Sequence, residues 1–231
     1  MEETFAPALE VEITRRTVPG FAAAVAEPLA PDGAIAIIEA VRDALGWDRF
    51  YLAAHSMGAR VAIRYTRRHQ KRVERLALLD FLTAVRKKTR ERYEKKMDRR
   101  QPTYSSCDGM VQRYHLQPRG TTISDESLRA LGADSVTRLD NGRWTWKFDW
   151  RGFFMDYEPV WDEVSRIEAP CLIMRGEHSA VMTRPEFEKV LAVLREGCGV
   201  EIPGAYHHIP LDAPESVAAG LIDFSRVGSK P

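Results

Sequence analysis

The sequence of 231 residues has few cysteines, no excess charge of either sign and no long apolar run. Its cysteines (Cys107, Cys171 and Cys198) are scattered and odd in number, so they predict neither a disulfide framework nor a cysteine metal site. The 34 Lys and Arg residues balance 33 Asp and Glu residues, which gives no reason to expect nucleic acid or a membrane as partner. No stretch approaches the roughly 20 apolar residues of a membrane span, and the first residues, Met-Glu-Glu-Thr, are acidic where a signal peptide is basic. We therefore expect a cytoplasmic protein.

Apolar residues make up 44% of the chain, enough for a sizeable core. Short apolar runs typical of buried strands occur at 50–54, 76–79, 170–174 and 199–202. Apolar residues at helical spacing occur at 33–47, 57–69, 185–194 and 216–224. Because the strands and helices alternate with short links, we expect an α/β fold whose mostly parallel sheet is connected by crossover helices.

Residues 82–160, here called the inserted segment, interrupt this alternation. They begin with a highly charged helix from residue 85 to about residue 100, whose basic side chains are interleaved with acids as on a solvated helix face. An aromatic stretch follows at 144–150. A loop of this length without structure is unusual, so we expect a mainly helical lid inserted into an α/β core of residues 1–81 and 161–231.

The most informative stretch is Ala-His-Ser-Met-Gly-Ala at residues 54–59. A serine between a buried strand and a helix, with a small residue two positions away on each side, is typical of a nucleophile elbow. The tight turn exposes the Ser56 hydroxyl. The backbone N–H of Met57, at the start of the helix, is then directed at developing negative charge.

The chain resembles the α/β-hydrolase family. Residues 54–58 are close to the family's Gly-His-Ser-Met-Gly, with Ala54 replacing the first glycine, and residues 202–214 resemble the histidine loop that follows the last strand. Residues 142–149 resemble a segment of some members with lids. The resemblance implies that Ser56 is the nucleophile and His207 the base, with no metal or organic cofactor. The adjacent His208 is the rival of His207, and the family position favours His207.

In the family the serine and the histidine form a catalytic triad with an acid. Two carboxylates of this chain are candidates for that acid. The family usually has an acid in the loop after the third predicted core strand, but Ala180 stands at the expected position. Asp80, at the end of the second strand, where some members have their acid, is the preferred candidate. Glu177, within the usual loop, is the alternative.

The region before Ser56 departs most from the family. Residues 1–32 are rich in proline and too few to form the strands that usually precede the elbow, although residues 9–13 alternate like a strand. No His-Gly pair, the usual source of a second oxyanion donor, precedes the serine. We therefore expect an incomplete set of N-terminal strands, with an apolar sheet edge that a second copy of the chain could cover.

These features predict a serine hydrolase that cleaves an ester-like bond in a small, fairly apolar molecule through an acyl-enzyme. His55, Trp144, Trp146 and Phe148 are candidates for the substrate pocket. The alternative is a degenerate hydrolase-like protein, inactive or weakly active, that binds a ligand or partner. The missing His-Gly pair and Ala180 motivate that alternative.

Overall fold

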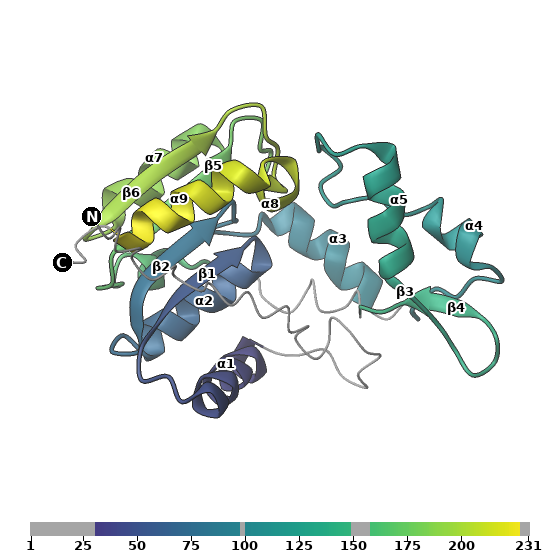
Figure 1. Ribbon diagram of the computed structural model, residues 1–231, viewed down its shortest axis with the longest axis horizontal. Coiled ribbons are helices and arrows are strands. Elements are labelled where there is room, and N and C mark those ends of the chain that lie inside the picture. The colour runs from purple at the N-terminus through teal and green to yellow at the C-terminus, as the bar shows by residue number, and fades with distance from the viewer. Residues whose placement is uncertain (1–30, 98–99, 149–157, 227–231) are drawn as a thin grey trace, which may run out of the picture.

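The computed structural model describes residues 31–97, 100–148 and 158–226 (Figure 1). At its centre is a four-stranded sheet in the order β1-β2-β5-β6, in which every neighbouring pair is parallel. The strands are β1 (Phe50–His55), β2 (Val73–Leu79), β5 (Cys171–Gly176) and β6 (Gly197–Ile202). The α/β fold class expected from the sequence is confirmed.

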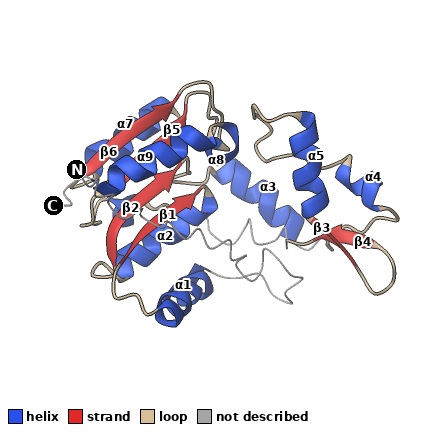
Figure 2. Cartoon of the chain, in the orientation of Figure 1, coloured by secondary structure: helices blue, strands red, loops and turns tan. Residues whose placement is uncertain are grey.

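Helices cover both faces of this sheet. One face packs against helices that precede or separate the strands: α1 (Pro31–Leu45), α2 (Met57–Arg68), α6 (Trp161–Val164) and α7 (Arg184–Val193). The other face packs against two helices that follow the last strand, α8 (Ile209–Asp212) and α9 (Pro214–Arg226). The layers can be followed in Figure 2. The ends of the helices differ from the expected ends by a few residues.

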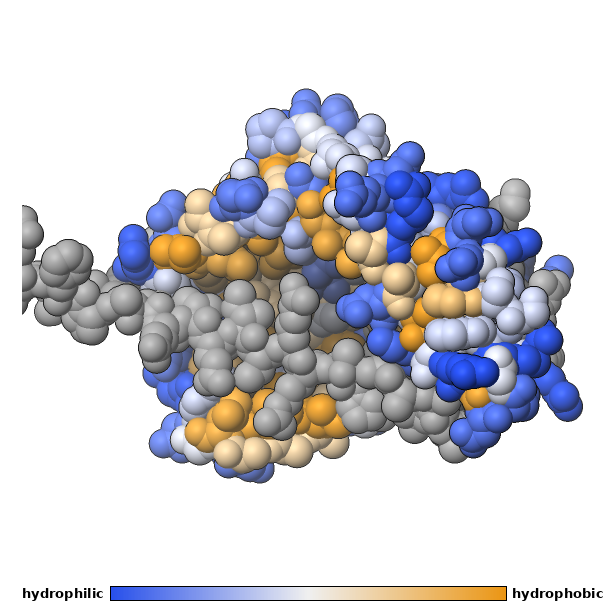
Figure 3. All heavy atoms as spheres, turned by 45° about the vertical axis from the view of Figure 1, so that its right-hand side comes forward, coloured by the Kyte–Doolittle hydropathy of each residue, from blue (hydrophilic) through white to orange (hydrophobic). Residues whose placement is uncertain are grey.

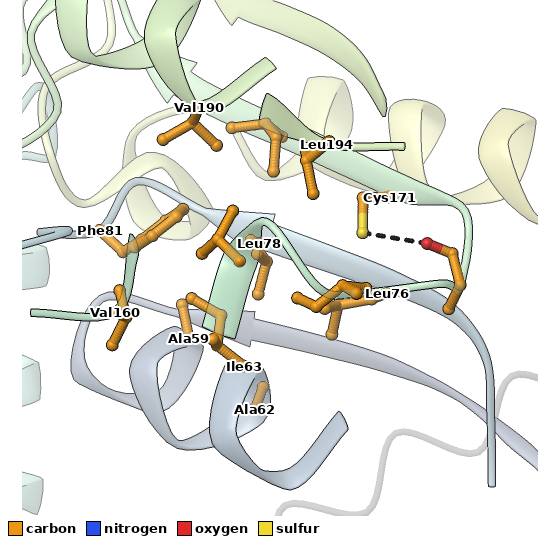
Figure 4. Packing of buried hydrophobic residues seen from close by; sticks show 14 of the residues in the cluster. Ala59, Ala62, Ile63, Leu76, Leu78, Phe81, Val160, Cys171, Val190 and Leu194 are labelled. Carbon is orange, nitrogen blue, oxygen red and sulfur yellow. Dashed lines mark hydrogen bonds between the residues drawn. The ribbon is translucent and has the colours of Figure 1, made fainter. Parts of the chain in front are cut away.

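The central strands carry apolar residues on both faces, which is why they form continuous apolar runs in the sequence. Leu76 and Leu78 of β2 point to the core cluster shared with α2, and Ala77 and Leu79 point to the cluster under α9. Figure 4 shows α2 presenting Ala59, Ala62 and Ile63 to the first of these clusters. These three positions lie at i, i+3 and i+4, on one face of the helix. Each buried Leu or Ile contributes about 1.5–3 kcal/mol.

The inserted segment lies to one side of the sheet (Figure 1). It contains α3 (Lys87–Met97), α4 (Cys107–Val111), α5 (Asp125–Asp134) and an antiparallel pair, β3 (Val136–Arg138) with β4 (Trp144–Trp146). Helices are present, as expected, but the described part of the segment also contains a strand pair that was not expected, and the mainly helical character stays a prediction. That this segment acts as a lid over a substrate remains a prediction.

Among the described strands, β1 forms one edge of the sheet, and its Tyr51 is 47% exposed. The strand expected at 9–13 and the incomplete N-terminal strands lie outside the described residues. In the space-filling view, apolar residues also gather near the lower margin, at the height of α1 (Figure 3). Whether a second copy covers this edge stays a prediction. None of the helices within the described ranges is long and apolar enough to cross a membrane.

Candidate active site

Ser56 occupies a strained turn between β1 and α2. Its backbone has φ 55° and ψ −119°, in a region that residues other than glycine rarely adopt, at a cost of about 1–3 kcal/mol. The turn is held because the Ser56 N–H donates to the Leu79 carbonyl (2.9 Å) and the Ser56 carbonyl accepts from the Ala59 N–H (3.1 Å). A Cβ added at Gly58 would lie 3.8 Å from that of Ala54, so Ala54 replaces the family's first glycine without crowding.

His207 connects the serine to a buried carboxylate. Its Nε2 lies 2.9 Å from Ser56 Oγ, and its Nδ1 lies 2.8 Å from Asp80 Oδ1. The His207 side chain is only 3% exposed, and that of Asp80 is completely buried. With the ring proton on Nδ1, facing the carboxylate, the lone pair on Nε2 faces the hydroxyl. This is the geometry that a serine needs to lose its proton to a base.

The Asp80 carboxylate accepts three hydrogen bonds. Oδ1 accepts from Ser179 Oγ (2.6 Å) as well as from His207, and Oδ2 accepts from the Gly176 N–H (2.9 Å). Such bonds compensate for burying a charge. Gly176 also lets β5 approach the histidine loop, since an added Cβ would overlap the carbonyl oxygen of Tyr206. The carboxylate is therefore fixed to β5 as well as to β2.

The structure brings Asp80 to His207 and places Glu177 elsewhere. Glu177 is exposed, and its Oε2 accepts from the Gly204 N–H (2.8 Å). Ala180, where the sequence led us to expect an acid, is also exposed. Its neighbour Ser179 is the residue of this loop that reaches the site, through its bond to Asp80. Sequence reasoning missed Ser179, because nothing in the loop distinguishes it before β2 and β5 are paired.

His208 and His55 surround His207 without taking its place. His208 Nε2 donates to the Pro118 carbonyl (3.0 Å), and His55 Nε2 donates to the His207 carbonyl (2.8 Å). The rings of His55 and His207 have centroids 4.8 Å apart. Burial, with a further contribution from His207, lowers the pKa of His55 to about 4, and burial also lowers the pKa of His208. Both side chains are therefore neutral at pH 7.

The low pKa of His55 predicts a loss of stability in acid. An unfolded chain binds the proton below its ordinary pKa of 6.5, whereas the folded protein resists it until about pH 4. The free energy of unfolding should therefore fall as the pH drops through this window, by up to about 3 kcal/mol from His55 alone. Urea unfolding at pH 7 and pH 4.5 measures the difference.

Glutamine is a suitable replacement for His55 because its amide can still donate to the His207 carbonyl but does not titrate. Between pH 7 and pH 4.5 the free energy of unfolding of His55→Gln should fall by about 2–3 kcal/mol less than that of the wild type. His115→Gln, at an exposed histidine, is the matched control and should behave like wild type. If the free energy of unfolding falls equally in the wild type and in His55→Gln, the pKa of about 4 for His55 is contradicted.

The inserted segment is fastened to the histidine loop. Asp212 Oδ1 accepts from Thr121 Oγ1 (2.5 Å) and the Thr122 N–H (2.9 Å), while its Oδ2 accepts from the Tyr206 N–H (2.8 Å). The bond from His208 to Pro118 adds a further connection. One stretch of the inserted segment therefore lies against the loop that carries His207.

The predicted pocket residues fall into two groups. His55 lies beside His207, as described above. Trp146 instead stacks on Phe148 (centroids 5.9 Å apart) and contacts Tyr104 and Tyr114, and Trp144 is bonded through its backbone to Tyr104. Trp146 and Phe148 therefore contact aromatic rings of the inserted segment, and both are partly buried. A role for Trp144, Trp146 and Phe148 in binding substrate stays a prediction.

Met57 begins α2, directly after Ser56. The first N–H groups of a helix have no carbonyl partner within it, and the helix dipole favours negative charge at this end. An oxyanion formed on a molecule bound at Ser56 Oγ would lie near this end. The family's usual source of a second donor is a His-Gly pair before the serine, which the sequence lacks, and residues 1–30 lie outside the described residues.

The sequence matches one known family, described as serine aminopeptidase S33, over residues 19–214. The chain belongs to this family of α/β-hydrolases. The resemblance drawn from residues 54–58 and 202–214 is therefore confirmed.

Individual relatives agree with this assignment. The esterase Rv0045c of Mycobacterium tuberculosis is 29% identical over 102 residues, which are 42% of this chain and 34% of that protein. The matched region thus spans about a third of the curated relative. Its crystal structure has a TM-score of 0.65 at 22% identity, covering 84% of this chain and 68% of that one. The crystal structure of E-2-(acetamidomethylene)succinate hydrolase has a TM-score of 0.71 at 17% identity, with coverage of 86% and 75%. At these identities the structures show the α/β-hydrolase fold alone.

Proposed function

We propose that this protein is a serine hydrolase that cleaves an ester-like bond in a small, fairly apolar molecule through an acyl-enzyme. The observation that carries the proposal is the hydrogen-bonded series from Ser56 Oγ through His207 to Asp80 Oδ1, with bonds of 2.9 and 2.8 Å. Membership of the S33 family, and an esterase as a relative, support hydrolysis as the reaction class. They do not favour the alternative of a degenerate, inactive protein.

In the proposed mechanism His207 Nε2 takes the hydroxyl proton as Ser56 Oγ attacks the ester carbonyl carbon. Asp80 holds the ring with its proton on Nδ1 and stabilises the imidazolium that forms. The N–H of Met57 donates to the oxyanion. His207 then returns the proton to the leaving alcohol, which leaves an acyl group on Ser56. Water, deprotonated by the same histidine, then attacks the acyl carbon. The bond from that carbon to Ser56 Oγ breaks, His207 returns the proton to Ser56 Oγ, and the acid is released.

The family description and the curated relative indicate different scissile bonds, since one is named for aminopeptidases and the other is an esterase. We propose ester cleavage because a free amino terminus needs a carboxylate partner beside the site. Within the part of the chain that the structure describes, two carboxylates beside His207 already have donors: Asp80 accepts from Ser179, Gly176 and the histidine itself, and Asp212 accepts from three donors of its own. The predicted cytoplasmic location is retained as part of the proposal.

A panel of chromogenic substrates tests this proposal. The protein should hydrolyse p-nitrophenyl acetate and butyrate with saturable kinetics, and should leave amino-acid p-nitroanilides intact. Each rate is compared with that of His207→Gln, which keeps an amide near the serine but removes the base. Esters cleaved at the same rate by both proteins, or anilides cleaved faster than esters, would overturn the proposal.

A further inference from the structure

Ser179, in the loop after β5, has a hydroxyl group that is arranged to donate in one direction. The residue is 8% exposed, and its Oγ accepts from the N–H of Val181 (3.1 Å) and from that of Met182 (3.2 Å). A serine hydroxyl has two lone pairs and one proton. Because N–H donors take both lone pairs, the proton is directed to Asp80 Oδ1, 2.6 Å away. This distance is typical of a hydrogen bond donated to a charged carboxylate.

Both partners of this hydrogen bond are held in place by contacts to the backbone. In the loop, the buried Arg175 donates from Nε to the Met182 carbonyl (3.0 Å). Asp80 has φ 40°, a conformation that residues other than glycine rarely adopt, and its N–H donates to the Met174 carbonyl of β5 (2.8 Å). The fold therefore directs the Asp80 carboxylate at the Ser179 hydroxyl.

Asp80 Oδ1 is shared between Ser179 and His207, whose Nδ1 lies 2.8 Å from it. A hydrogen bond donated to a charged group stabilises its charged form. Asp80 and His207 together carry a full negative charge when His207 is neutral, and no net charge when it is protonated. The Ser179 bond therefore favours the state with a neutral His207. Only the neutral ring can take the hydroxyl proton of Ser56.

We propose that Ser179 is a positioning residue for the reaction proposed above. Its hydroxyl keeps Asp80 Oδ1 directed at His207 Nδ1 and limits how tightly Asp80 and His207 together hold a proton. His207 can then act as a base at a lower pH than it could without this hydroxyl. The effect on the rate rests on the proposed function, whereas the protonation of His207 can be followed without a substrate.

Other titratable side chains also lie around Asp80 and His207. His55, at the end of β1, and His208 have ring centroids 4.8 Å from that of His207, and burial lowers the pKa of both. Three further charged side chains of the surrounding strand and loops are bonded to other groups: Arg175, Glu177 and Asp212. All of these are present in every variant compared below, so a difference between the variants measures the Ser179 hydroxyl.

The protonation of His207 is measured first, by NMR titration of protein labelled with ¹³C in its histidine rings. The chain has 6 histidines, and the signal of His207 is the one missing from His207→Gln. The midpoint of its titration should lie about 0.5–1 pH unit higher in Ser179→Ala than in the wild type. Ser179→Thr, which keeps the hydroxyl, should restore the wild-type midpoint. Ser165→Ala, at an exposed serine, is the matched control and should leave the midpoint unchanged.

The rate is measured second, with p-nitrophenyl acetate over a range of pH. In Ser179→Ala the pH at which kcat/KM falls to half its maximum on the acid side should rise by the same amount. At the plateau kcat should fall by about 10-fold with little change in KM, because the hydroxyl faces Asp80. Ser179→Cys keeps a weaker donor and should shift both midpoints in the same direction by less. It replaces Ser179→Ala if thermal melting shows the alanine variant to be unfolded.

The two measurements separate a positioning role from a structural one. A loop that is merely loosened lowers the rate at every pH and leaves the midpoints where they are. A folded Ser179→Ala protein whose His207 titrates with the wild-type midpoint would therefore overturn the proposal, whatever its rate. If the midpoint rises as expected but the wild type cleaves no ester, the effect of Ser179 on His207 stands and the proposed function fails.

Discussion

Replacing Ser56 with alanine is expected to lower kcat for a short ester by about 10⁶-fold. The reason is that Ser56 Oγ is the proposed attacking atom and, among the described residues, is the hydroxyl bonded to His207 Nε2. The turn itself should survive, because alanine and serine meet the same strain at a φ of 55°. The free energy of unfolding should therefore change by no more than about 1 kcal/mol.

For Ser56→Ala, steady-state kinetics measure kcat and urea unfolding of the same preparation measures the free energy of unfolding. Together they distinguish a loss of catalysis from a loss of folded protein. Ser165→Ala is the matched control, since Ser165 is exposed and its hydroxyl donates to the Asp162 carbonyl (3.0 Å) of its own helix turn. This control should keep the wild-type rate. A Ser56→Ala protein that is folded and still hydrolyses the ester within 10-fold of wild type, a threshold of about 1.4 kcal/mol, would contradict the role of Ser56.

Replacing Asp80 with asparagine is the second large effect, and we expect kcat to fall by about 10⁴-fold. The amide has nearly the same shape, but its nitrogen is a donor. In the place of Oδ2 this nitrogen would face the N–H of Gly176, which is also a donor, and in the place of Oδ1 it cannot accept from His207 Nδ1 or Ser179 Oγ. The second orientation leaves the Nδ1 proton of His207 without an acceptor. The ring then prefers its proton on Nε2, where it can no longer take the proton from Ser56.

The matched variant is Glu177→Gln, because Glu177 was the other candidate acid. Its side chain is exposed and bonds to the Gly204 N–H, so the rate should stay within about 2-fold of wild type. Thermal melting checks that Asp80→Asn is folded at the assay temperature. A large loss in Glu177→Gln together with a small loss in Asp80→Asn would reverse the assignment.

The parts of the site that the sequence predicts well are those that depend on neighbouring residues. The elbow is a strand, a serine and a helix within about 20 residues, so residue spacing alone indicates the strained turn at Ser56. The layered core is likewise predictable, because strands such as β2 that are buried on both faces form unbroken apolar runs. The choice of His207 over His208 came from the family position, and the structure places His207 against Ser56.

The parts that the sequence left open depend on contacts between distant segments. Whether Asp80 or Glu177 meets His207 is decided by the pairing of β2 with β5, where Leu79 lies opposite Met174. This register places Asp80 next to the loop that holds Ser179, and no local pattern encodes it. The aromatic stretch is similar: Trp146 could line a pocket or pack within the inserted segment. The ring contact between Trp146 and Tyr104, 42 residues apart in the sequence, is visible only in the structure, and the pocket role of Trp146 stays a prediction.

Labelling with a fluorophosphonate probe tests the central claim, an activated nucleophile at Ser56, without requiring the natural substrate. The probe reacts with serines whose hydroxyl is activated by a base, and peptide mapping locates the adduct. We predict a stoichiometric adduct on the peptide that contains Ser56 in the wild type, and none in Ser56→Ala. A folded wild-type protein that takes up no probe, or takes it up at another residue, would contradict the account.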